Sequence, residues 1–78
     1  MATTDPIAQY IEEGSGGARL RESGVEIWAL IAQLPAMDDD LTRLANAYGL
    51  PRDAVKAALA YYQCHQELVD AQIALNAA

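Results

Sequence analysis

Several features that would explain the stability or location of so small a chain are missing from this sequence. The 78 residues contain one cysteine, so no disulfide can form within the chain. No apolar run approaches the ~18 residues of a membrane-spanning helix. The N-terminus has no basic segment followed by an apolar stretch, which is the pattern of a secretory signal. We therefore expect a cytoplasmic protein with no membrane association.

Basic residues are also scarce. Five lysines and arginines stand against 11 aspartates and glutamates, giving a net charge of -6. This balance disfavours strong sequence-independent binding to nucleic acid, in which neutralisation of phosphates dominates the affinity. The chain is nevertheless 53% hydrophobic, as expected of a folded domain. Because a chain of this length buries only about 60% of its surface, we expect a homodimer, a higher oligomer or a complex with a partner.

The first segment with a clear pattern is a predicted hairpin arm, residues 7–22. Glycines at 14, 16 and 17 indicate a turn. The residues that follow, Ala18-Arg19-Leu20-Arg21, alternate between apolar and basic, as in a strand. We predict two strands within residues 10–21. Two strands alone are unstable in water, so this hairpin must pack on helices or on another copy of the chain.

Residues 23–62 predict a three-helix core. Ser23 and Glu26 have the spacing of a capping box, followed by an apolar stretch, with Trp28 in the core, that ends at Pro35. Residues 38–40, all aspartate, offer an N-cap for a second helix, and Gly49 is suited to end it in a left-handed conformation. Pro51 then falls in the first turn of a third helix. The predicted fold is mainly α, with a homeodomain-like helix-turn-helix core, a small N-terminal β-hairpin and a C-terminal helical extension.

Residues 41–59 match the helix-turn-helix pattern in detail. Ala45 is small where two helices cross, Gly49 makes the turn, and Leu50 fills the space beneath it. The second helix of such a unit enters the major groove of DNA with its first turns toward the bases. The candidate DNA-binding residues on that helix are Arg52, Asp53 and Lys56, and Arg43 on the preceding helix is placed to touch a phosphate. The alternative is a helical hairpin that serves packing alone.

The predicted C-terminal extension, residues 63–78, contains no glycine or proline. It forms either one long helix or two helices with a bend near His65. Its apolar residues exceed what one small domain can cover, so we expect it to meet a partner or a second copy. The residues predicted for a partner or dimer interface are Tyr10, Ile11, Tyr61, Glu67, Leu68, Asp70, Ile73 and Leu75.

A family resemblance adds to this interpretation. Residues 55–70, VKAALAYYQCHQELVD, resemble the signature of a small bacterial family catalogued as domain of unknown function 433. The segment from Arg19 to Trp28 and the Ala45-x-x-Tyr-Gly-Leu50 motif are similar to it as well. Members are regarded as antitoxin-like proteins with a homeodomain-like DNA-binding core. The resemblance implies a type II antitoxin that blocks a PIN-like nuclease toxin and binds its own promoter DNA.

Chemistry at a catalytic or metal site is not expected. Metal sites need three or four ligands, and the chain has one cysteine and one histidine, Cys64 and His65. We expect His65 to hydrogen-bond nearby backbone or an acidic group, and Cys64 to be a small buried side chain. No nucleophile stands with a matching base, so we predict neither an enzyme nor a bound cofactor.

Overall fold

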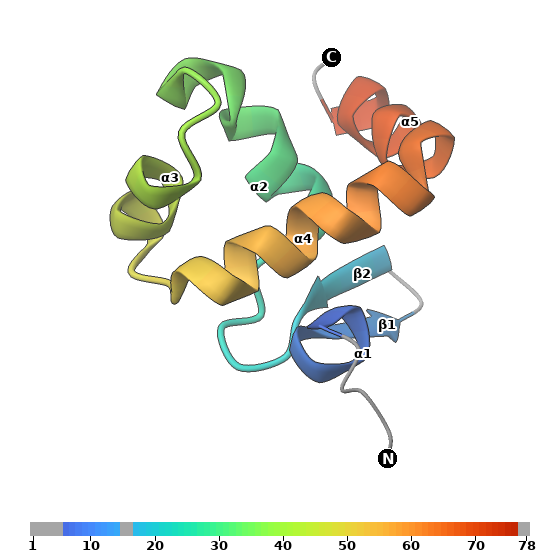
Figure 1. The fold of residues 1–78 in the computed structure, drawn as a ribbon. Coiled ribbons are helices and arrows are strands. Elements are labelled where there is room, and N and C mark those ends of the chain that lie inside the picture. Colours follow the sequence, from blue (N-terminus) through green and yellow to red (C-terminus); the bar gives the residue numbers. More distant parts are fainter. Residues whose placement is uncertain (1–5, 15–16, 77–78) are drawn as a thin grey trace.

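The computed structural model describes residues 6–14 and 17–76. Along these residues the elements are α1 (Pro6–Tyr10), β1 (Ile11–Gly14), β2 (Gly17–Leu20), α2 (Ile27–Gln33), a short 3₁₀ turn (Pro35–Met37), α3 (Leu41–Tyr48), α4 (Arg52–Cys64) and α5 (Gln66–Asn76). The predicted class, mainly α with a small N-terminal hairpin, is confirmed. Figure 1 shows α4 crossing the middle of the molecule, with the other elements arranged around it.

The hairpin is antiparallel, and its register pairs Ile11 with Leu20 and Gly14 with Gly17. Alternation along β2 turns Ala18 and Leu20 inward, where both are buried, as the period-two pattern predicts. The sequence-based prediction of the hairpin arm did not include a helix, whereas residues 6–10 form the short helix α1 before the first strand. Ile11 opens that strand at 4% exposure. Its assignment to a partner interface was therefore wrong, since the side chain lies in the core of its own chain.

The capping box predicted at Ser23 and Glu26 does not form. The backbone of Arg19 forms an isolated antiparallel β-bridge with the backbone of Glu26, which lies beyond the hairpin. The carbonyl oxygen of Val25 also accepts a hydrogen bond from the Leu20 N–H at 2.8 Å. These contacts hold the backbone extended through residue 26, so α2 begins only at Ile27. The Ser23 hydroxyl instead accepts from the Val25 N–H, and the Glu26 carboxylate accepts from the indole N–H of Trp28. Trp28 is half-buried at the edge of the core rather than within it.

The start of α3 and the turn after it match the sequence pattern. Asp40 is the N-cap, and its carboxylate accepts from the backbone N–H groups of Thr42 at 3.0 Å and Arg43 at 3.2 Å. Gly49 ends the helix with φ 65° and ψ 35°, the left-handed conformation that a side chain would strain. The Leu50 N–H then closes the turn on the Ala45 carbonyl oxygen at 2.8 Å.

α4 is the central helix, and α1, α2, α3 and α5 all contact it. Its buried positions are mostly small: Ala54, Ala57 and Ala58 are each at most 4% exposed. Alanine lets neighbouring backbones approach closely, which is how one helix of 13 residues can be surrounded by four others. The buried apolar residues form one cluster that also includes Val69 of α5.

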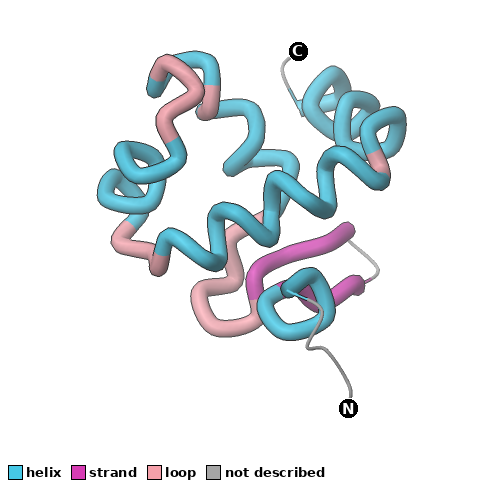
Figure 2. The backbone as a smooth tube through the Cα atoms, in the orientation of Figure 1, coloured by secondary structure: helices cyan, strands magenta, loops and turns pink. Residues whose placement is uncertain are grey.

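The C-terminal segment takes the second predicted form, two helices with a bend at His65. The His65 backbone leaves helical geometry at φ -132°, and its N–H donates to the carbonyl oxygens of Tyr61 and Tyr62. α5 then turns back against α2 and α4 (Figure 2). Cys64, at the bend, is exposed, so the prediction of a buried cysteine was wrong.

Candidate nucleic-acid interface

The helix-turn-helix unit consists of α3, the turn 49–51 and α4. α3 packs on α4 through a buried pair, Leu44 and Ala45, at 0% and 3% exposure. The left-handed conformation of Gly49 ends α3 and lets the chain change direction within the turn 49–51. The extended backbone of Pro51 then leads directly into α4. The unit therefore places the first turn of α4 at an end of the molecule, away from α5 (Figure 1).

One face of α4 is open to solvent along the length of the helix. At 3.6 residues per turn, positions 52, 56, 60 and 63 lie within a narrow arc. Arg52, Lys56 and Gln63 are exposed there, and Ala60 between them is half-buried. Asp53 is exposed at the edge of the same arc. The opposite side of α4 carries Ala54, Val55, Ala57, Ala58 and Tyr61, all buried.

The two cations on this face are not neutralised. Within residues 6–14 and 17–76 the ion pairs are Arg21 with Glu12 and Arg43 with Asp38. Arg52 and Lys56 therefore remain available for an anionic ligand. They also lie in the first turns of α4, where the helix dipole is positive and attracts anions. We define Arg52, Lys56 and Gln63 as the α4 face. The sequence-based set lacked Gln63, although its spacing of 11 from Arg52 is a signal for it.

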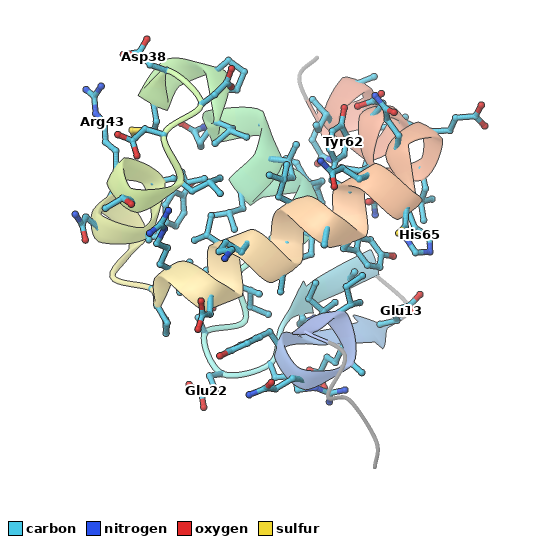
Figure 3. The ribbon with its side chains drawn as sticks, viewed as in Figure 1. Glu13, Glu22, Asp38, Arg43, Tyr62 and His65 are labelled. Carbon is cyan, nitrogen blue, oxygen red and sulfur yellow. The ribbon has the colours of Figure 1, made fainter. Side chains whose placement is uncertain are left out.

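Arg43 is placed differently from the other candidate DNA-binding residues. It projects from α3, and its guanidinium donates to the Asp38 carboxylate at 3.3 Å. Both side chains point away from the body of the molecule, beside α3 (Figure 3). Such an exposed ion pair contributes little to stability, so Arg43 can exchange Asp38 for a phosphate at little cost. The structure thus brings Arg52, Asp53 and Lys56 together and leaves Arg43 on the neighbouring helix.

The adjacent side chains of Tyr61 and Tyr62 lie in different surroundings. Tyr61 is 2% exposed and stacks on the His65 ring, with centroids 4.2 Å apart. Burial raises the pKa of the Tyr61 hydroxyl above its ordinary value, and the nearby Glu13 charge adds to the effect. The assignment of Tyr61 to an interface was therefore wrong, because the ring lies on the buried side of α4 and stacks on His65. Tyr62 is half-buried instead, and its hydroxyl donates to Asp70 at 2.9 Å.

The remaining predicted interface residues are distributed over different surroundings. Tyr10 is half-buried and lines a cleft of about 320 Å³ together with Leu50 and Pro51 of the turn. Ile73 is half-buried against the core. Leu68 and Leu75 are exposed on α5, and Glu67 is exposed in its first turn. Asp70 is exposed but bound to Tyr62, so the set does not form one continuous surface.

The part of the chain that the structure describes offers no group of three or more histidine, cysteine, aspartate or glutamate side chains able to hold a metal ion. His65 Nδ1 lies 3.1 Å from the Tyr61 carbonyl oxygen, which is the backbone contact expected of it. None of the described helices is long and apolar enough to span a membrane.

Comparison with known proteins finds no matching family model, curated protein or solved structure. The family resemblance therefore rests on the sequence motifs alone.

Proposed function

We propose that this protein binds DNA in a sequence-specific manner through the α4 face, and that it acts as an antitoxin-like autoregulator. The observation that carries the DNA-binding proposal is the pairing of Arg52 and Lys56. They stand one turn apart on an exposed helix face, in the first turns after a helix-turn-helix bend, with no carboxylate bound to either.

The dimensions of α4 suit a major groove. The groove is about 12 Å wide and accepts one helix. From Arg52 to Gln63 the α4 face runs about 16 Å, at about 1.5 Å per residue, which is the length of about five base pairs at about 3.4 Å each. Arginine and lysine pair with guanine, glutamine pairs with adenine, and Asp53 can accept from the amino group of cytosine. The face therefore carries groups that discriminate bases.

The net charge of -6 bears on how this binding would behave. Each phosphate contact contributes about -0.9 to the slope of log affinity against log salt concentration. With Arg43 of the neighbouring helix as the candidate phosphate contact, one chain would make few such contacts. We expect a shallow salt dependence and weak affinity for unrelated DNA, so most of the affinity would come from base contacts.

Neutralisation of a PIN-like nuclease toxin is the second half of the proposal, and its support is the family resemblance. Co-expression with the nuclease encoded beside it, where there is one, tests this half directly. Rescue of growth by the chain supports it. If the chain still binds DNA but does not rescue growth, the antitoxin half of the proposal is wrong and the protein is a DNA-binding regulator alone.

A second candidate function is a protein-interaction or dimerisation module that no longer contacts DNA. The acidic surface favours it, as does the occupation of Arg43 by Asp38. Under this alternative the α4 face would be an ordinary solvated helix surface, and its cations would serve solubility alone.

Selection of DNA sites from a random library separates the two functions. The wild-type chain should enrich a defined motif, and Arg52→Ala should reduce affinity for it by about 1–3 kcal/mol. Arg43→Ala should instead weaken binding to all sequences alike. Arg19→Ala is the matched control, because it removes the same charge from β2, where the Arg19 guanidinium lies beside Gly14. The absence of an enriched motif, or equal losses for Arg52→Ala and Arg19→Ala, would refute the DNA-binding proposal.

A further inference from the structure

α5 has apolar residues on two opposite sides, and one side has no cover within the described chain. Val69 is fully buried and Ile73 is half-buried, and both face α2 and α4. Leu68 and Leu75, in contrast, are 52% and 80% exposed. Together with the exposed Ala71 they lie at i, i+3 and i+7, which is one line along a helix. We call Leu68, Ala71 and Leu75 the outer stripe.

Solvated helix faces are normally polar, so two exposed leucines in line indicate a surface that meets a partner. The spacing of three and then four residues is that of a helix packing into the holes of another helix. Ala71, between the leucines, is small enough to let a second helix approach closely. The stripe is therefore built to receive a helix rather than a loop or a flat surface.

The sequence of α5 indicates which helix that is. The stripe reads leucine, alanine, leucine in either direction, so an antiparallel copy of α5 presents the same pattern to it. In that arrangement Leu68 of one copy meets Leu75 of the other on both sides of a twofold axis, which is the self-complementary contact typical of homodimers.

The charges on α5 favour the same arrangement. α5 carries two carboxylates, Glu67 and Asp70, both in its first half, and it has no lysine or arginine. A parallel pair would set the two acidic halves and the two positive helix ends side by side. An antiparallel pair places each acidic half beside the uncharged residues 71–76 of the other copy. Ala74 lies on the same flank of the stripe as Glu67, so it would face Glu67 of the second copy.

We infer that the outer stripe is the self-association surface of this protein, where α5 pairs antiparallel with α5 of a second copy. The surface lies at the opposite end of α4 from its first turn (Figure 1). Pairing there leaves Arg52 and Lys56 free, and the inference does not depend on DNA binding. An interface formed by one short helix from each chain falls in the small, transient class, below about 1,200 Å².

Sedimentation equilibrium of the full chain from about 5 to 500 µM, a range suited to transient contacts, tests the inference. Wild type should show a monomer–dimer equilibrium. Leu75→Gln and Leu68→Gln should each raise the dissociation constant about tenfold or more, which corresponds to about 1.4 kcal/mol. Both positions are exposed, so circular dichroism should show an unchanged fold. Tyr48→Gln is the matched control, since Tyr48 is a partly exposed aromatic on α3, at 37%, and should leave the equilibrium unchanged.

A pair of charge variants at one exposed position tests the orientation. Ala74→Lys would place a cation beside Glu67 of the second copy and should tighten the dimer, whereas Ala74→Glu should loosen it. A chain that stays monomeric throughout the range, or a dimer indifferent to both leucine substitutions, would overturn the inference. A dimer that responds to the leucines but is tightened by Ala74→Glu would overturn the antiparallel arrangement.

Discussion

Val69 is the residue through which α5 is anchored, and its truncation offers a quantitative test of the fold. It is the one fully buried residue of α5, at 0% exposure, within a helix that contacts α2 and α4. Val69→Ala removes two methyl groups, worth about 1.6 kcal/mol at about 0.8 kcal/mol each. A residual cavity of about 50 Å³ would add about 1 kcal/mol at about 24 cal/mol per Å³. The expected loss is about 2–3 kcal/mol.

That loss is large for so small a domain. At about 0.05–0.15 kcal/mol per residue, the whole chain has a free energy of unfolding of about 4–12 kcal/mol. The melting temperature should fall by about 10–20 °C, since each kcal/mol shifts a domain of this size by about 4–8 °C. The variant should still fold, because the other buried residues of the core are untouched.

The assay is urea denaturation followed by far-ultraviolet circular dichroism, at a concentration low enough to keep the chain monomeric. Leu75→Ala is the control, because Leu75 lies on the same helix but is 80% exposed, and its truncation should cost less than about 0.5 kcal/mol. If Val69→Ala costs no more than Leu75→Ala, α5 is not anchored on the core. The surface proposed for self-association would then have no fixed place in the molecule.

Two further predictions concern a helix cap and a buried hydroxyl. Asp40→Ala should destabilise the chain by about 1 kcal/mol, because two N–H groups of α3 lose their acceptor. Asp40→Asn should cost much less in the same denaturation assay, and equal losses would contradict the capping role. Burial raises the pKa of Tyr61 above 10.0, so the unfolded chain loses this proton at lower pH than the folded one. Stability should therefore be unaffected by this group below about pH 10 and fall as the pH rises further, and the fall should be smaller in Tyr61→Phe.

Local sequence patterns predicted those elements whose ends are set by nearby residues. Asp40 begins α3 with its own carboxylate, and Gly49 ends that helix because left-handed backbone strains other residues. The alternation in Ala18-Arg19-Leu20 likewise gave the correct inward face of β2. The Asp40 cap and the Gly49 turn act within a few residues along the chain, and the alternation follows from the period of a strand, so all three can be inferred without knowledge of the fold.

Contacts between distant segments decided what the patterns could not. α2 begins at Ile27 rather than just after Ser23, because the backbone of Arg19, on the hairpin, forms a β-bridge with the backbone of Glu26. Packing of α4 against the other helices buries Tyr61 and leaves Cys64 exposed, the opposite of what the sequence pattern predicted for each. Burial of Ile11 likewise depends on how the hairpin lies against the helices.

The candidate functional surfaces show the same division. Arg52 and Lys56 share a face because the period of an α-helix is fixed, so the sequence by itself determined that pairing. Whether Arg52 and Lys56 form ion pairs depends on the positions of the 11 aspartates and glutamates. Only the tertiary structure showed that Asp38 pairs with Arg43 and Glu12 with Arg21. In α5 the sequence supplied apolar residues on two sides of one helix. Packing against α2 and α4 decided which side is buried, because one helix can turn only one face to a given core.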